Sequence, residues 1–228
     1  MSKRPRGGKA LVWVACLLPA AWLAYEALTG RLGANPIETV LDRTGWWALA
    51  LLLTSLAVTP IRRITGWNRV IRYRRLLGLF AFAWATAHFL GYVVLDQWFA
   101  WSFIIEDITE RPFILVGFSA WVLLLPLAVT STRGWIRRLG RRWVSLHKLV
   151  YVAAALGSLH FFWKVKADTR EPLVFIVVLA VLLLLRAPMV AQKAREVRAG
   201  RGTAGKNIGG PDGAARREEE QVSAPGPR

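Results

Sequence analysis

The sequence predicts an all-α polytopic membrane protein, with six transmembrane helices in one bundle and both termini in the cytoplasm. Three observations support this prediction. The 228 residues are 54% hydrophobic, with a mean hydropathy of +0.35. The apolar residues form six long runs, and Lys and Arg gather in alternate segments between the runs. Such a pattern is typical of polytopic membrane proteins, and a conventional water-facing core is therefore not expected.

The first predicted helix covers residues 10–28 and follows a basic segment, residues 1–9. At 1.5 Å per residue this run can cross a hydrocarbon core of about 30 Å. A basic head before an apolar stretch is also the pattern of a cleaved signal peptide. We favour an uncleaved helix, because the run is longer than a usual signal-peptide core and Tyr25 and Glu26 blur any small-residue cleavage site.

Five further apolar runs follow in order. Asn35-Pro36 indicates a turn before the second helix. Pro126 is tolerated in the fourth, because neighbouring helices can satisfy the freed backbone groups. Between the third and fourth helices, residues 96–112 carry four acids and one arginine among aromatic residues, so we expect this segment to lie along the membrane interface. The predicted helices cover residues 45–61, 76–95, 113–129, 146–163 and 172–189.

The orientation follows from the Lys and Arg in each segment. With Lys148 assigned to the loop before it, the segments hold 4, 2, 6, 1, 6, 3 and 9 such residues from the N-terminus onward. Segments rich in Lys and Arg stay in the cytoplasm. We therefore expect a basic cytoplasmic N-terminus (residues 1–9), a helical domain in the bacterial inner membrane (residues 10–190) and a disordered cytoplasmic tail (residues 191–228) rich in Gly, Ala, Pro and charge.

The net charge of +17 does not indicate a nucleic-acid partner, because the charges lie in short blocks between apolar runs. The basic loops are first of all topology determinants. Anionic membrane lipid, a flavin phosphate and a soluble partner are alternative ligands for them. The single cysteine, Cys16, excludes an intramolecular disulfide and a zinc or iron-sulfur site built on cysteine.

Two of the three histidines lie at matched depth in the predicted bundle. His88 is 13 residues after Arg75, and His160 is 12 residues after Lys148. Both helices run outward from the cytoplasm, so both imidazoles lie about 18 to 20 Å in, in the outer half of the membrane. Ionisable residues inside a membrane are functional candidates. We expect His88 and His160 to be the two axial ligands of one haem b iron.

The third histidine, His147, lies about 20 Å from His160 along the helix axis, at the cytoplasmic rim. A second redox centre would lie at this level. Its partner on the third helix would stand near position 74 or 75, where the chain has Arg74 and Arg75 instead. His147 therefore either serves an incomplete inner site or packs without a ligand.

Two other classes of function compete with electron transfer. A small transporter would use the histidines as a proton relay, but the sequence has no pair of membrane-embedded acids to complete it. In a structural anchor the histidines would only pack. No catalytic residues are predicted, because no Ser or Thr has a nearby His and acid in a triad-like arrangement.

Several stretches resemble the MsrQ family, also called YedZ, of the ferric-reductase-like transmembrane group. The resemblance is dense from Asn35 to Trp163 and looser in the outer helices. It is carried by NPIETVLDRTGWWALALLLTSLAVTPIRR, RRLLGLFAFAWATAHFLGY, EDITERPFILVGF, PLAVTSTRGWIRRLGRRWVSLHKLVYV and LHFFW.

The resemblance implies a haem-binding subunit that takes electrons from the quinone pool or from a cytoplasmic flavin reductase. The acceptor it implies is a periplasmic molybdopterin-containing methionine-sulfoxide reductase that repairs oxidised envelope proteins. The family's haem-associated histidines correspond to His88, His147 and His160, and the family is also described with FMN. His147 would then serve an inner haem, flavin or quinone site. Larger relatives have two complete histidine pairs and a fused flavin and nicotinamide domain, whereas here we expect an incomplete inner pair and only the short tail after the sixth helix.

Overall fold

The computed structural model describes residues 7–186, and within them the chain is helical apart from turns and loops. The chain divides into two compact units, of which the first ends at Leu182 and the second begins at Leu183. The fold described below is that of the first unit. Residues 1–6 and the predicted tail, residues 191–228, lie outside the described residues.

Five helical stretches among the described residues are long and apolar enough to cross a membrane. This confirms the all-helical fold and gives candidate spans at five of the six predicted positions. Residues 170–182 are also helical, but the sixth predicted helix runs past the described residues, so its crossing stays a prediction. The five stretches are α1 (Gly7–Leu28), α2 (Pro36–Thr65), Asn68–Asp96, α5 (Pro112–Val129) and Arg141–Lys164.

Two of the five stretches are composite. Asn68–Asp96 consists of η1 (Asn68–Tyr73), α3 (Arg74–Gly91) and the π-helical turn η2 (Tyr92–Asp96). Arg141–Lys164 consists of α7 (Arg141–Leu146) and α8 (Leu149–Lys164). The short helices α4 (Trp101–Glu110) and α6 (Arg133–Leu139) connect the long ones.

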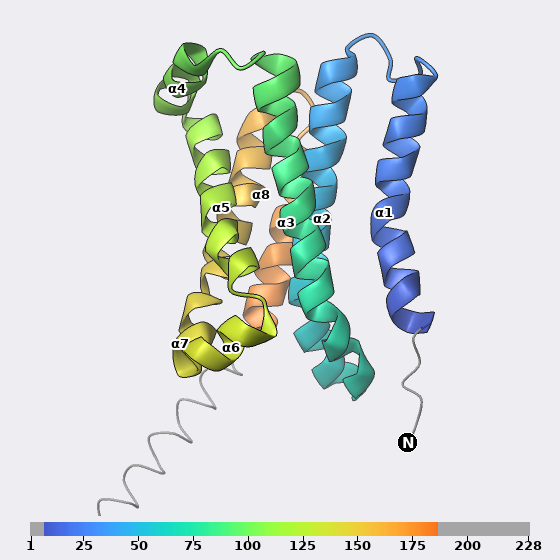
Figure 1. The fold of residues 1–228 in the computed structure, drawn as a ribbon, viewed down its shortest axis with the longest axis vertical. Helices are drawn as coiled ribbons and strands as arrows, with labels where there is room; N and C mark the ends of the chain where they lie inside the picture. The colour runs from blue at the N-terminus through green and yellow to red at the C-terminus, as the bar shows by residue number, and fades with distance from the viewer. Residues whose placement is uncertain (1–6, 187–228) are drawn as a thin grey trace, which may run out of the picture. The chain divides into compact units, whose positions relative to one another are not determined.

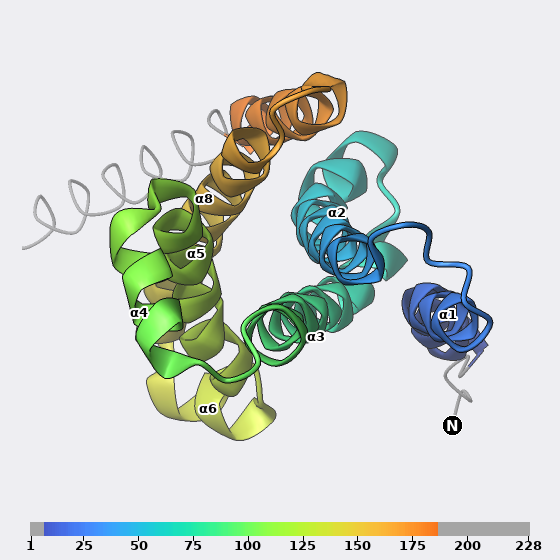
Figure 2. The same cartoon turned by 90° about the horizontal axis from the view of Figure 1, so that it is seen from above.

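Four of the long helices form two packed pairs, α2 with α3 and α5 with α8. Contacts between α3 and α5, and between α2 and α8, join the pairs into one bundle (Figures 1 and 2). Large apolar side chains fill the interior of this bundle. The most buried members of the core include Leu52, Leu53, Leu56, Ala81, Trp84, Ala153 and Ala154.

α2 is much longer than the apolar run that predicted it, residues 45–61, because capping residues fix both of its ends. The Asn35 side chain accepts a hydrogen bond from the backbone N–H of Glu38, and Pro36 occupies the first turn, where its missing N–H costs nothing. Gly66 ends the helix with φ of 69°, a conformation that favours glycine. The extra turns carry Leu41 and Asp42 to the end of the bundle where α4 lies.

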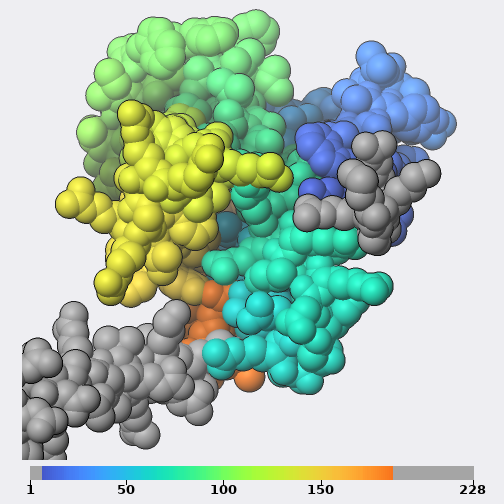
Figure 3. All heavy atoms as spheres, turned by 60° about the horizontal axis from the view of Figure 1, so that its bottom comes forward, coloured from blue at the N-terminus to red at the C-terminus, as the bar shows by residue number. Residues whose placement is uncertain are grey.

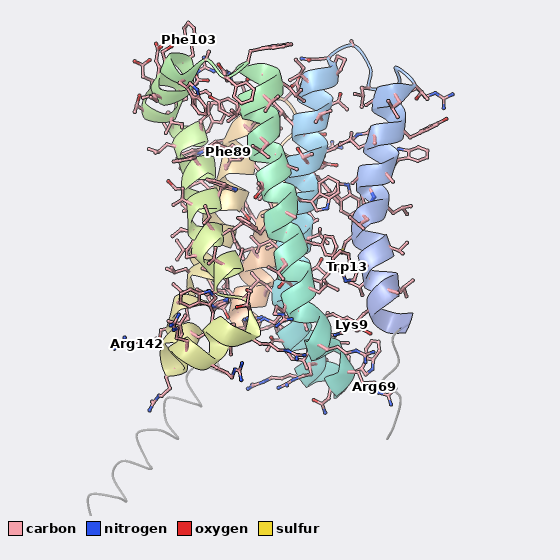
Figure 4. The ribbon with its side chains drawn as sticks, viewed as in Figure 1. Lys9, Trp13, Arg69, Phe89, Phe103 and Arg142 are labelled. Atoms are coloured by element: carbon pink, nitrogen blue, oxygen red, sulfur yellow. The ribbon has the colours of Figure 1, made fainter. Side chains whose placement is uncertain are left out.

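α1 lies at the side of the bundle, next to α2 and α3 (Figure 2). The side chain of Trp13 points toward α3 (Figure 4). Its ring meets the ring of Phe80 edge-on, with the ring centres 4.8 Å apart. The indole N–H of Trp84 donates to the Cys16 carbonyl at 3.2 Å. An ion pair joins Glu26 to Arg43 of α2. Most other side chains of α1 are exposed, as expected for a helix that faces lipid.

Charge divides the two ends of the bundle in the described part of the chain. One end carries η1, α6 and α7, which form the face turned forward in Figure 3, and we call it the basic end. Figure 4 labels Lys9, Arg69 and Arg142 there. Every Asp and Glu of residues 7–182 lies instead in a segment toward the opposite end, which carries α4 and which we call the α4 end.

We predict that Trp84→Phe loosens α1, because phenylalanine keeps the ring in the core but cannot donate to the Cys16 carbonyl. The expected loss in the free energy of unfolding is about 1 kcal/mol. Thermal unfolding in detergent measures it, with Trp22→Phe on the exposed face of α1 as the control. Equal midpoints for Trp84→Phe and the unmodified protein would contradict the role given to this hydrogen bond.

Candidate functional site

The bundle brings His88 of α3 and His160 of α8 together. Their ring centres are 6.1 Å apart, and the ring planes meet at 74°. A metal–imidazole bond is about 2 Å long, so two such bonds and the distance from each ring nitrogen to its ring centre add up to about 6 Å. The spacing therefore fits one metal ion between the two rings.

Each imidazole is oriented by a backbone carbonyl of the helix that packs beside its own. Nδ1 of His88 lies 2.9 Å from the Leu41 carbonyl oxygen of α2, and Nδ1 of His160 lies 2.7 Å from the Phe113 carbonyl oxygen of α5. A carbonyl only accepts, so Nδ1 carries the proton and donates. Nε2 of each ring then keeps its lone pair. A backbone partner of this kind is what metal-binding histidines usually have.

Two glycines make room for the rings. A Cβ at Gly45 of α2 would lie 3.1 Å from Nδ1 of His88. A Cβ at Gly117 of α5 would lie only 2.6 Å from Nδ1 and 2.9 Å from Cγ of His160, closer than such atoms approach. Any larger residue at position 117 would push the imidazole aside, so glycine is required there by close approach.

A cavity of about 470 Å³ opens beside the two histidines, a size in the range of cofactor pockets. Its deep part is apolar and is formed by residues of all four bundle helices. Its mouth lies at the α4 end and is polar. The deep residues are Leu49, Leu52, Ala85, Ala120, Leu124 and Ala153, and the charged residues at the mouth are Glu38, Asp42, Asp96, Asp107, Arg111 and Lys164.

These residues suit haem better than a bare metal ion. Within residues 7–186 no three His, Cys, Asp or Glu side chains are grouped to hold a metal ion. Two imidazoles alone leave a metal under-coordinated, whereas the porphyrin itself supplies four nitrogen ligands. The flat aromatic rings of Phe89, Phe118 and Trp121 also line the cavity, and those of Phe89 and Trp121 stack at 4.5 Å. Phe89 lies between α3 and α5 in Figure 4.

A buried carboxylate ties α4 to the cavity mouth. Asp107 accepts hydrogen bonds from the Tyr92 hydroxyl at 2.9 Å and from the Gln97 amide at 3.3 Å. Its other oxygen pairs with Nε of Arg111 at 3.0 Å. Tyr92 begins the π-helical turn η2, a distortion that often marks functional sites. From the sequence, residues 96–112 were predicted only as a connecting segment along the membrane interface, and this network was not predicted.

His147 lies apart from the other two histidines and does not line the cavity. It ends α7 at the joint with α8, and its ring stacks on Trp143 with centres 3.9 Å apart. Nδ1 contacts the Trp143 carbonyl oxygen at 3.1 Å. Nε2 is buried and makes no hydrogen bond of normal geometry in the described structure, although the Leu127 backbone carbonyl lies near the ring. The structure thus pairs His88 with His160 and leaves His147 at the basic end.

The known proteins that are similar to this chain agree on one family. Residues 44–158 match the family described as the ferric reductase like transmembrane component. The chain is 50% identical over 200 residues to the protein-methionine-sulfoxide reductase heme-binding subunit MsrQ of Rhodospirillum rubrum, covering 87% of this chain and 96% of the relative. The proteins of the same name from Xanthomonas axonopodis and Caulobacter vibrioides are 50% identical over 181 residues and 49% identical over 177 residues. Each alignment covers 77% of this chain, and 83% and 84% of the respective relative. No solved structure is significantly similar.

We predict that Gly117→Ala displaces the His160 ring and weakens haem binding by about 10- to 100-fold, the usual cost of disturbing the support of a metal ligand. Haem per purified chain, measured by absorption, gives the result. Gly78→Ala is the matched control, because a Cβ there meets only Ser55 Oγ at an ordinary 3.4 Å. Full haem content in Gly117→Ala would show that the His160 position is not needed for binding.

Proposed function

The chain belongs to the MsrQ family of haem-binding subunits of protein-methionine-sulfoxide reductases, and we propose that it carries electrons across the bacterial inner membrane through haem b. The haem is held between His88 and His160. The electrons go to a periplasmic molybdopterin-containing methionine-sulfoxide reductase, which repairs oxidised envelope proteins. The chain itself then needs no catalytic residue, since the bond chemistry belongs to its partner.

The arrangement of the two imidazoles is the observation that carries this proposal. Their centres are 6.1 Å apart, and each Nδ1 is engaged by a carbonyl, so both Nε2 lone pairs remain for iron. Haem b supplies the one-electron couple of its iron. The protein holds the ring orientation through Leu41 and Phe113. The apolar residues deep in the cavity exclude water from the site.

The membrane orientation follows from the charge of the two ends. The basic end carries the Arg-rich η1 and α6–α7 segments and faces the cytoplasm by the positive-inside rule. The haem cavity then opens toward the periplasm, on the side of the acceptor. A sixth crossing by residues 172–189 returns the chain to the cytoplasm, so that both termini lie there.

Electrons enter from the cytoplasmic side, from the quinone pool or from a cytoplasmic flavin reductase. His147 lies on that side, and its buried Nε2 makes no hydrogen bond of normal geometry, which supports a role at an inner haem, FMN or quinone site. The chain then carries one or two haems, according to whether the inner site takes haem.

We predict that the purified protein shows the α band of a reduced b-type haem, and that His88→Ala and His160→Ala each abolish the band of the outer haem by removing an axial ligand. His147→Ala is the comparison variant and keeps it. A colourless wild-type protein from haem-replete cells would overturn the proposal. Partner activity that survives replacement of all three histidines would favour a structural anchor, and ion flux in liposomes without a haem spectrum would favour a transporter.

We also predict that a fluorescent protein fused to the C-terminus is fluorescent, whereas alkaline phosphatase fused there is inactive, because both reporters remain in the cytoplasm. A fusion at Gln97, in the loop at the α4 end, should give the opposite pair of results. Active phosphatase at the C-terminus would mean that the chain crosses the membrane an odd number of times from a cytoplasmic N-terminus.

A further inference from the structure

The cavity has opposite polarity at its two ends. Its floor is formed by buried aliphatic side chains, among them Leu52 and Leu124, which are 5% and 8% exposed. Its mouth carries four carboxylates and two cations, Arg111 and Lys164. Haem has the same asymmetry, because both of its propionate carboxylates lie on one edge and the rest of its rim is hydrocarbon.

We propose that the haem sits with its propionate edge at the mouth, and that Arg111 and Lys164 are the side chains that hold the two propionates. This inference rests on the proposed function. The reverse orientation would bury two ionised carboxylates against Leu49, Leu52 and Leu124, and uncompensated charges in an apolar floor are strongly disfavoured. The mouth is the end of the cavity that offers cations.

Arg111 is positioned for a propionate by its place at the start of α5. It is the N-cap residue, two positions before Phe113, whose carbonyl accepts the hydrogen bond of His160. Its side chain is 60% exposed and pairs with Asp107 through Nε. A guanidinium has five N–H donors, so its terminal nitrogens can bind a second carboxylate while Nε stays on Asp107.

Lys164 stands one helical turn beyond the ligand His160, at the end of α8. It pairs with Asp42 and lies 3.8 Å from Glu38, both on α2. An ammonium group has three N–H donors, so it too can bind a further carboxylate. The two cations thus lie at the start of α5 and the end of α8, the two helices that fix the His160 ring. Both cations line the same cavity.

The acids of the mouth make these two cations necessary. Asp107 is held by Arg111, Tyr92 and Gln97, while Asp42 and Glu38 are held by Lys164. If either cation is removed, the propionate next to it faces carboxylates that have also lost the cation that paired with them. Like charges so close together repel, and the repulsion grows when reduction adds an electron to the haem.

The test reconstitutes the haem-free full-length protein in detergent with haem or with haem dimethyl ester, whose propionates are uncharged. We expect Arg111→Gln and Lys164→Gln each to weaken haem binding by about tenfold, as for the loss of one charge-assisted hydrogen bond. Each variant should bind the ester as tightly as the wild-type protein binds it. The midpoint potential of the bound haem, measured by spectroelectrochemistry, should become more negative in both variants.

Controls separate the propionate contact from other effects. Lys166→Gln removes an exposed cation two residues from Lys164 that does not line the cavity, and it should leave both affinities unchanged. Arg111→Lys keeps the charge and should recover most of the haem affinity, which also tests whether the variant protein is folded. Equal weakening of haem and ester in Arg111→Gln and Lys164→Gln would overturn the proposal. A wild-type protein that binds neither compound would instead overturn the proposed function.

Discussion

The site depends on two hydrogen bonds that cross between packed helices. His88 of α3 is bonded to a carbonyl of α2, and His160 of α8 to a carbonyl of α5. These are the same two helix pairs that make the main packing contacts of the bundle. The direction of each Nε2 is therefore set by helix packing and by a backbone atom, and not by a partner side chain. The contacts that stabilise the bundle therefore also orient the two histidine rings.

Close helix approach is what lets the carbonyls reach the rings. Gly117 and Gly45 face His160 and His88 at distances that leave no room for a Cβ at the first and little at the second. Small residues at helix contacts are a general device of membrane bundles, since apolar side chains gain little from packing together in lipid. Here the space they leave is filled by an imidazole instead of by the neighbouring backbone, which couples packing to the ligand.

Hydropathy and charge predicted much of the fold, because long apolar runs and basic loops are local signals. They also gave His88 and His160 comparable depths, because depth depends only on residue count from the membrane edge. They could not give the rotation of each helix about its axis, so the carbonyl partners and Gly117 were not predicted. Asp107 was missed for another reason: its partner Tyr92 lies on another element, and an acidic connecting segment carries no sign of which acid is buried. The joint between α7 and α8 at His147 was not predicted either, because it falls at the start of the single apolar run predicted as residues 146–163.

The two proposed iron ligands belong to separate hairpins of the chain, α2 with α3 and α5 with α8. During synthesis the ribosome releases the first hairpin well before the second, so no complete coordination site exists until α8 has entered the bilayer. A porphyrin bound there would bridge the two hairpins and stabilise the folded bundle, because it binds the folded state and not the unfolded chain. In cells starved of haem, the halves would be held by helix contacts alone and become easier substrates for membrane proteases.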